Sequence, residues 1–341
     1  MKIESLKVKH KNIPFFTPHS GCTYDCAFCC QTKITGYSMP QGDMLAEAER
    51  LKRTVEDALP HLDGAKALIA FFGGSFTAIE PKRMERLLET AYSYVKSGHV
   101  SGIRLSTRPD CIDVNVLDVL SRYGVTDIEL GIQSTDNGVL TASGRGHGAE
   151  DCFKAARLIK ERGFRLTGQM MIGLPCSALD KETQTALDIA EMGADAARIY
   201  PTVVFEGTRL HTMTLEGDYK PLSNEEAAGR SAACIRILRD AGLKILRVGL
   251  HSSKELKAAP FGPNHPAMGE LAYSRLLLED IRGKIGKAQT AGKTLKIYVP
   301  AGLESKAAGI NGENKEKLVK EYGFKKVKIY AKSGELSVEL R

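Results

Sequence analysis

Short apolar runs alternate with longer amphipathic stretches through the first 260 residues, and this alternation restricts the fold more than any other feature of the chain. Six runs have the length and composition of buried strands, namely 67–72, 103–106, 127–132, 166–172, 197–200 and 244–248. Helical periodicity follows at 81–94, 150–162, 181–192 and 224–241. Strands that alternate with helices indicate parallel βα units, whose active sites form at the carboxyl ends of the strands. The sequence therefore predicts an α/β fold with its chemistry at one rim of a parallel sheet.

Three cysteines lie close together in the segment Gly-Cys-Thr-Tyr-Asp-Cys-Ala-Phe-Cys, at Cys22, Cys26 and Cys29. Their thiolates can hold one metal centre, and a 4Fe–4S cluster with three protein ligands leaves one iron open. Zinc sites usually add a second cysteine pair, and two-cluster ferredoxins use another spacing. A disulfide framework is not expected in a chain of 341 residues with eight cysteines and no export signal. Cys30 is expected not to be a ligand, because adjacent side chains diverge.

The cysteine segment resembles the cluster loop of the radical S-adenosylmethionine (SAM) enzymes. The resemblance implies that Cys22, Cys26 and Cys29 bind a 4Fe–4S cluster, and that SAM chelates the open iron through its amino and carboxylate groups. It also implies reductive cleavage of SAM to a 5′-deoxyadenosyl radical that abstracts hydrogen from a substrate. Phe28, directly before the last cysteine, is implied to pack near the adenine. The fold of this superfamily is an open, partial (β/α)6 TIM-like barrel, which six strands would suit.

Polar and glycine-rich turns follow the predicted strands, and the resemblance implies a SAM site there. The implied residues are Gly73, Gly74, Ser75, Ser106, Gln133, Arg145 and Gln169. Glycine at Gly73 lets the backbone approach a small polar ligand closely, although a plain turn is the alternative interpretation. Arg145 suits a carboxylate because its planar fork binds two oxygens, and a surface ion pair is the alternative. Ser106 and Gln169 depart from the acidic residues that related enzymes often carry, which weakens those two assignments.

Six short sequence motifs in the predicted barrel resemble those of a more specific family. They are Ser-Thr-Arg-Pro-Asp (106–110), Glu-Leu-Gly-Ile-Gln-Ser (129–134), Arg-Gly-His (145–147), Met-Met-Ile-Gly-Leu-Pro (170–175), Arg-Ile-Tyr-Pro-Thr (198–202) and Glu-Gly-Thr (206–208). From about residue 13 to 275 the chain resembles the radical SAM half of the Elongator catalytic subunit, which modifies wobble uridine in tRNA. The same motifs resemble a bacterial group of short Elongator-like proteins. About 70 residues follow Pro266, too few for that subunit's acetyltransferase domain, so transfer of an acetyl-derived group is not expected.

The basic charge of the chain is confined to its last part. Residues 281–341 contain 14 Lys and Arg against 6 Asp and Glu, a net charge of +8, whereas the other 280 residues have a net charge of −1. A polyanionic partner and a lysine-rich solvated surface both account for such an excess. We expect a barrel domain at 1–265 and a basic α/β domain at 266–341.

The order of predicted elements in this basic domain is that of a small α/β unit. A strand at 296–300 precedes helices at 303–308 and 313–322, the second ended by Gly323, and strands follow at 326–330 and 336–340. This order resembles the core of a KH domain, whose GxxG loop clamps RNA. The resemblance implies that Gly309, Ile310, Asn311 and Gly312 bind RNA. The loop lacks the usual basic residue, no third KH helix is predicted, and a cap over the barrel is the alternative.

The rest of the chain supports an enzyme of the cytoplasm. The N-terminal segment has no apolar core for export, and no stretch reaches the roughly 18 uncharged apolar residues that a membrane span needs. We expect a radical SAM enzyme that modifies RNA, in the first place tRNA, with an electron donor such as ferredoxin or flavodoxin. No catalytic role is assigned to the remaining polar residues near strand ends, which are His19, His147, Tyr200, Glu206, His251 and His265.

Two other functions stay open at this point. One is a radical SAM enzyme that acts on a small molecule, in tetrapyrrole or cofactor metabolism, with the basic domain as a lid. The other is an iron–sulfur protein that binds RNA or senses redox state without catalysis.

Overall fold

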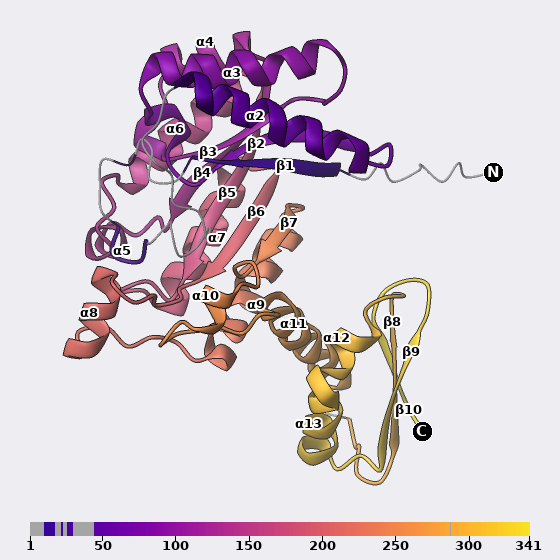
Figure 1. Ribbon diagram of the computed structural model, residues 1–341. Coiled ribbons are helices and arrows are strands. Elements are labelled where there is room, and N and C mark those ends of the chain that lie inside the picture. Colours follow the sequence, from indigo (N-terminus) through magenta and orange to yellow (C-terminus); the bar gives the residue numbers. More distant parts are fainter. Residues whose placement is uncertain (1–9, 18–21, 23–25, 30–43, 287) are drawn as a thin grey trace.

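The chain folds into a larger parallel sheet with its helices and a smaller unit at the C-terminal end (Figure 1). The computed structural model describes residues 10–17, 22, 26–29, 44–286 and 288–341. The strands of the larger sheet are β1 (His10–Phe16), β2 (Lys66–Phe72), β3 (Ile103–Thr107), β4 (Val125–Gln133), β5 (Arg165–Ile172), β6 (Ala196–Pro201) and β7 (Lys244–Val248). The smaller sheet contains β8 (Thr294–Val299), β9 (Lys326–Ala331) and β10 (Ser337–Leu340).

Helices connect these strands. The α-helices are α2 (Met44–Ala58), α3 (Pro81–Lys96), α4 (Val114–Arg122), α5 (Asn137–Ala142), α6 (Ala149–Glu161), α7 (Leu179–Glu191), α8 (Arg209–Glu216), α9 (Asn224–Asp240), α10 (Lys254–Lys257), α11 (Met268–Ile285), α12 (Glu304–Ala308) and α13 (Glu313–Tyr322). Short 3-10 turns are η1 (Leu59–His61), η2 (Phe76–Ala78), η3 (Pro109–Cys111) and η4 (Ile310–Gly312).

The strands of the larger sheet lie side by side in chain order, β1 to β7, and every neighbouring pair is parallel. Their carboxyl ends therefore meet at one rim, beside α5 and α8 in Figure 1. The sheet curls into an open half-barrel of the predicted kind, with one strand more than the six that the sequence indicates.

Successive side chains of a strand point to opposite faces of the sheet. Helices cover the convex face, to which apolar side chains of the strands point. Ile103, Leu105 and Ile128 point outward and are fully buried in the main core. Local signals fix the helix starts. Glu80 accepts hydrogen bonds from two amides of α3 and precedes Pro81, and Ser223 forms a capping box at α9.

Strand β1 is absent from the sequence prediction. It pairs in parallel with β2, from His10 opposite Lys66 to Phe16 opposite Phe72. Proline at Pro14 and the polar residues at its start argue against a central strand. β1 is the edge of the sheet, where the missing amide of Pro14 costs no ladder hydrogen bond.

The smaller unit has a core of its own. Its sheet has the order β10-β8-β9, with β8 parallel to β9 and antiparallel to β10. Helices α11, α12 and α13 bury apolar side chains against one face of this sheet. Gly323 has a left-handed backbone and ends α13 as predicted. Helix α11, which sequence analysis did not predict, is a third helix of this unit beside α12 and α13.

Helix α11 belongs to both cores. Ala272 and Leu276 pack in the core of the half-barrel, whereas Leu278, Ile281 and Ile285 pack in the core of the smaller unit. The division expected at residues 265 and 266 therefore falls just before a helix that both parts share.

In the part of the chain that the structure describes, no helix has the length and apolar character needed to span a bilayer.

Candidate functional site

Cys22 and Cys26 lie against the rim of the half-barrel. Cys22 is exposed, and its Sγ lies 4.0 Å from Oγ of Ser75. Ser75 is buried in the turn after β2, which begins with Gly73 at φ 96°. Glycine is needed at Gly73 because other residues are strained at that φ. The structure thus brings the predicted cysteine ligand and the predicted glycine turn together; Cys30 lies outside the described residues.

Arg145 joins the second cysteine to the end of β4. Its Nη1 donates to Sγ of Cys26 at 3.3 Å, and its Nη2 donates to the carbonyl oxygen of Gly131 at 2.7 Å. Cys26 is buried, and the amide of Ala27 donates to the carbonyl of Ser143, just after α5. This arginine is therefore no surface residue in an incidental ion pair, because it sits between a thiol and a strand end.

Gln133 occupies a strained position at the end of β4. Its φ is 67°, a region that non-glycine residues rarely adopt, and the ladder to β5 shifts between Gly131 and Gln133. A side chain at Gly131 would lie 3.2 Å from Nε2 of Gln133 and 3.6 Å from Nη2 of Arg145. The absence of a side chain at Gly131 therefore lets these two predicted SAM residues approach each other. Backbone strain of this kind clusters at ligand sites.

Polar atoms without protein partners gather at this rim. Ser106 Oγ, Gln133 Oε1 and Arg145 Nε are buried and have no hydrogen-bond partner among the described residues. Buried polar atoms normally have a partner, so a bound ligand or water is expected there. Gln169 lies on β5 opposite Gly131, and it is partly exposed.

Phe28 packs in a small apolar cluster. Its partly buried ring packs against the cluster formed by Val204, Leu210 and Tyr219, against which Met213 of α8 also packs. The amide of Leu210 donates to the carbonyl of Ala27, so α8 holds this end of the cysteine segment. The adenine contact implied for Phe28 stays a prediction.

The residues at the rim fit a cluster and SAM. Three thiols are the donor set that iron–sulfur centres use, and the guanidinium of Arg145 lies beside Cys26. Within the described ranges, no three His, Cys, Asp or Glu side chains are arranged as a ready metal site. The fit therefore rests on the donor chemistry and on the unpartnered polar atoms, and the ligand roles of the three cysteines stay proposals.

A buried histidine supports the same rim, although sequence analysis assigned it no role. His147 Nε2 lies 3.2 Å from the carbonyl of Ile132, and its Nδ1 lies 3.8 Å from Asp110. Asp110 accepts two hydrogen bonds from Arg108. Burial, followed by the nearby Arg145 cation, lowers the pKa of His147 to about 4. The imidazole is therefore neutral at pH 7 and forms no ion pair with Asp110.

A second polar cluster, which we call the lumen network, lines the concave side of the sheet. Glu129 on β4 lies 2.9 Å from Nε of Arg198 on β6 and 3.8 Å from Nε of Arg104 on β3. The guanidinium of Arg198 also lies 5.8 Å from the ring centroid of Phe72 on β2. Strands β2 and β6 are not neighbours, so this contact crosses the interior of the half-barrel.

The arginines of the lumen network respond differently to burial. Burial lowers the pKa of Arg104, and Glu129 only partly offsets this. Burial also acts on Arg198, but the closer Glu129 and the hydrogen bond to Tyr200 raise its pKa above the usual value. Burial and then Glu129 raise the pKa of Tyr200, which stays protonated. Both arginines remain cations at neutral pH, with one carboxylate between them.

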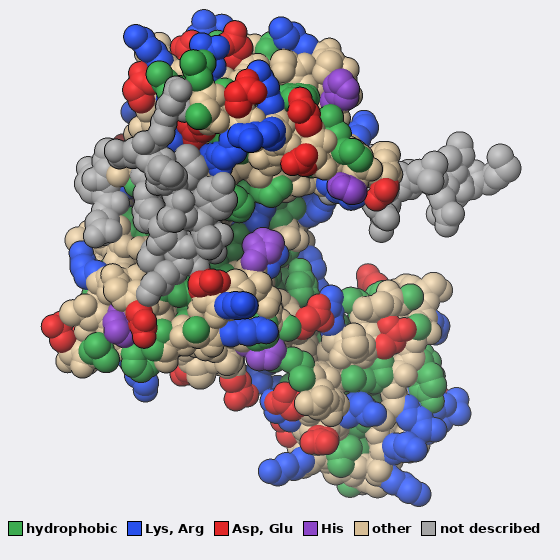
Figure 2. Space-filling model, in the orientation of Figure 1, with side chains coloured by type: hydrophobic (Ala, Val, Ile, Leu, Met, Phe, Trp, Pro, Cys, Tyr) green, Lys and Arg blue, Asp and Glu red, His purple; other side chains and the backbone are tan. Residues whose placement is uncertain are grey.

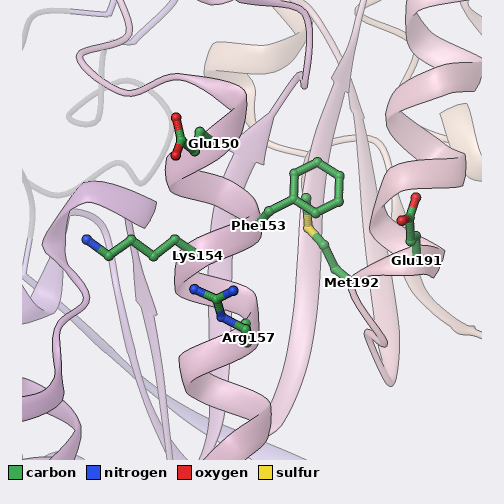
Figure 3. A pocket seen from close by; sticks show the side chains of 6 residues that line it. All are labelled: Glu150, Phe153, Lys154, Arg157, Glu191 and Met192. Carbon is green, nitrogen blue, oxygen red and sulfur yellow. The ribbon is translucent and has the colours of Figure 1, made fainter.

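A surface pocket between α6 and α7 has no part in this rim (Figure 3). Its lining residues are Glu150, Phe153, Lys154, Arg157, Glu191 and Met192. Two acidic and two basic side chains balance each other, and the pocket lies on the helical outside of the sheet. It contains none of the predicted site residues.

The GxxG loop of the smaller unit is a tight turn between α12 and α13. Gly309 has φ 79°, and a side chain there would lie 2.8 Å from the amide nitrogen of Asn314. The buried side chain of Asn314 donates to carbonyl groups at the end of α12 and to Ser274 of α11. Ile310 is exposed. The glycine thus has a structural reason, and RNA contact by this loop stays a prediction.

Comparison with known families identifies the superfamily of the chain. Residues 16–176 match the radical SAM superfamily, and residues 194–277 match the radical SAM C-terminal domain. The chain belongs to the radical SAM superfamily. This superfamily uses a 4Fe–4S cluster and SAM, which confirms the predicted cofactors.

Its relatives include proteins of the Elongator group. An uncharacterized protein of Methanocaldococcus jannaschii is 31% identical over 47% of this chain and 50% of its own length. A tRNA uridine(34) acetyltransferase of Methanocaldococcus infernus is 35% identical over 36% of this chain and 24% of its own. Elongator complex protein 3 of Bos taurus is 28% identical over 60% and 40%. The chain thus spans half or less of the length of these relatives.

A solved structure shows the same fold. The archaeal Methanocaldococcus infernus Elp3 with an N-terminal deletion superposes with a TM-score of 0.64 and 22% identity, over 80% of this chain and 64% of that chain. The predicted radical SAM half-barrel and the resemblance to Elongator are therefore confirmed.

Proposed function

We propose that this radical SAM enzyme modifies RNA, and that its substrate is tRNA. The observation that carries the catalytic part is the contact of Arg145 with both Cys26 and the end of β4. It joins the cysteine segment to the strand ends where Ser106 and Gln133 present unpartnered polar atoms.

In this proposal each rim residue has a defined task. Cys22, Cys26 and Cys29 hold the cluster, which together with bound SAM supplies a radical that removes hydrogen from the substrate. Arg145 binds the carboxylate of SAM through its planar fork. Gly73 lets the backbone come close to the amino group.

The remaining rim residues bind other polar groups of SAM. Gln133 and Ser106 bind them through atoms that are otherwise buried without partners. Gly74, Ser75 and Gln169 line the same rim, at the ends of β2 and on β5.

Two features support RNA as the substrate. The relatives that match part of this chain include a protein named tRNA uridine(34) acetyltransferase, and the last 61 residues of the chain have a net charge of +8. Phosphate backbones attract such surfaces. We further propose that the KH-like loop Gly309–Gly312 contacts this RNA, that a ferredoxin or flavodoxin supplies the electron, and that the reaction takes place in the cytoplasm.

The lumen network favours a second candidate, a small anionic substrate with the smaller unit as a lid. Arg104 and Arg198 share the carboxylate of Glu129, and the other carboxylate near Arg104, that of Asp127, is paired with Arg165. A phosphate or carboxylate of a small molecule would balance the remaining positive charge.

The test uses protein purified without oxygen, reconstituted with iron and sulfide, and reduced. The wild-type protein should bind about four irons and form 5′-deoxyadenosine from SAM. Cys29→Ala should abolish both, and Cys30→Ala should leave both unchanged. Total tRNA from a strain that lacks this protein should then gain a modified nucleoside, detected by mass spectrometry, when it is incubated with the wild-type protein and SAM.

Each outcome has a defined meaning. Iron binding that survives Cys29→Ala would refute the ligand assignment. If SAM is cleaved but no tRNA nucleoside changes, and tRNA does not raise the yield of 5′-deoxyadenosine, the small anionic substrate takes first place.

A further inference from the structure

One face of the small sheet is left open by the helices. Leu295, Ile297 and Val299 of β8 point into the core with α11, α12 and α13. Because side chains alternate along a strand, Lys296 and Tyr298 point to the opposite face. Figure 1 shows the helices on one side of β8, β9 and β10 and no described element on the other.

Two tyrosines form an aromatic step on this open face. Tyr298 of β8 lies directly opposite Tyr330 of β9 in the parallel register. Their ring centroids are 5.6 Å apart with planes inclined by 25°, and Tyr330 is 39% exposed. Nζ of Lys332 lies 5.2 Å from the centroid of the Tyr298 ring. A stacked, partly exposed pair beside a cation is a surface on which a further flat ring can stack.

Lysines surround the tyrosines on the same face. Lys296 of β8 lies opposite Lys328 of β9, and Lys326 lies one row further along. Lys326, Lys328 and Lys332 are exposed. Among residues 10–17, 22, 26–29, 44–286 and 288–341, no carboxylate forms a salt bridge with any of these four lysines. Glu339 of β10 lies opposite Lys296, accepts a hydrogen bond from the hydroxyl of Tyr298 and pairs with Arg341, so the charges of Lys326, Lys328 and Lys332 are the ones available to a partner.

On the helical side of the same unit three basic side chains are paired, whereas Lys315 and Lys320 of α13 are exposed and form no salt bridge with any described residue. Lys306 pairs with Glu270, Lys317 pairs with Glu313, and Arg282 pairs with Glu321. What distinguishes the open sheet face is therefore the combination of lysines with a stacked pair of tyrosines. In Figure 2 blue side chains line the outer lower-right edge, where Figure 1 places the small sheet.

We propose that this face binds a single-stranded segment of RNA. The tail sheet face comprises Lys296, Tyr298, Lys326, Lys328, Tyr330 and Lys332. Unpaired bases stack on the tyrosines, and the phosphates between them lie against the lysines. A duplex would meet the lysines but could not stack, because its bases are already stacked within the helix. The inference deepens the proposed function and rests on RNA being the substrate.

The experiment measures binding of the full-length protein to a fluorescent, unstructured 12-nucleotide RNA and to tRNA by anisotropy at several salt concentrations. Stacking contributes about 1–3 kcal/mol per base, so Tyr330→Ala should weaken binding of the unstructured RNA about 5- to 150-fold. Tyr330→Phe keeps the ring and should retain the affinity. Lys326→Gln with Lys328→Gln should reduce the slope of log K against log salt by about 1.4, at about 0.7 for each phosphate contact.

A second pair of lysines gives a control with the same change in charge. Lys315 and Lys320 are exposed on α13, on the helical side. Changing both to Gln should leave the affinity nearly unchanged. Every variant should keep the wild-type circular dichroism spectrum and form 5′-deoxyadenosine without substrate at the wild-type rate, because cluster and SAM lie in the half-barrel.

The remaining outcomes overturn the proposal in distinguishable ways. Equal losses from the two lysine pairs would indicate unspecific attraction by net charge. Loss of binding on Ile310→Asp with Asn311→Asp, together with full binding by Tyr330→Ala, would assign the RNA to the GxxG loop, and the proposed function would stand. If the wild-type protein binds neither RNA, the proposed RNA substrate fails along with this face.

Discussion

Glu129 holds two buried cations, so its neutralisation should destabilise the protein strongly. Its side chain is 4% exposed, and those of Arg104 and Arg198 are 7% and 12% exposed. Glu129→Gln keeps the shape of the side chain but removes its charge. Removal of one partner from a buried ion pair typically costs 3–5 kcal/mol, because the other charge stays buried without compensation.

The expected cost lies at the lower end of that range, since the amide oxygen of Gln still presents a partial negative charge to the two guanidinium groups. A loss of about 3 kcal/mol in the free energy of unfolding corresponds to a fall in Tm of about 4 °C for a protein of this size. Glu49→Gln is the matched control, because Glu49 pairs with Lys52 on the exposed side of α2. Exposed pairs contribute about 0–1 kcal/mol, so its Tm should fall by less than about 2 °C.

The assay is thermal unfolding of the reconstituted protein, followed by circular dichroism without oxygen. A second arm adds Arg198→Met, alone and combined with Glu129→Gln. The double variant should lose at least about 1 kcal/mol less than the sum of the single variants, because the two residues are in contact. A Tm for Glu129→Gln that equals the Tm for Glu49→Gln, or strict additivity in the double variant, would refute the buried pair.

Further predictions concern the rim and the outer core. Arg145→Lys loses the planar fork, so SAM affinity measured by equilibrium dialysis should fall about 10- to 150-fold, which corresponds to a loss of about 1.5–3 kcal/mol. The control Arg157→Lys, on the outside of α6, should leave SAM affinity unchanged. Unchanged SAM affinity in Arg145→Lys would remove Arg145 from the site. The pKa of His147 is about 4 in the folded protein and about 6.5 in the unfolded chain. As pH falls, the unfolded chain therefore binds more protons than the folded protein. The free energy of unfolding should decrease by about 1 kcal/mol between pH 7.5 and 5.5. His147→Gln should remove that slope in urea titrations, and an equal slope in His147→Gln and the exposed His61→Gln would contradict the assignment. Gly168→Ala would place a methyl group 2.7 Å from an isoleucine side chain of α7, and should lower stability by about 1–3 kcal/mol in the same titrations.

The half-barrel was predictable because its central strands are buried on their outer faces and are therefore continuously apolar or alternate cleanly. Strand β1 was not, because Pro14 and a polar start mark an edge strand. Helix α11 was missed for another reason. It packs against two cores, so its apolar residues surround the helix and do not form the single stripe that sequence analysis detects.

The rim was predictable from short motifs, and the structure brings Cys22 to Ser75 and Cys26 to Arg145. The lumen network was not. Polar residues that alternate with apolar residues along a strand usually indicate a face exposed to solvent. Such positions are occupied by Arg104, Glu129 and Arg198. Only the curvature of the sheet shows that they face one another.

Helix α11 gives the two parts of the chain a common fate. Because the same helix supplies Leu276 to one core and Ile281 to the other, loss of either core removes the support of the helix on which the other depends. Opening of one part is therefore thermodynamically coupled to opening of the other. A truncation at residue 265 would strip the half-barrel of Ala272 and Leu276, so the loss of an activity in such a fragment would report a damaged barrel and not the contribution of the basic domain.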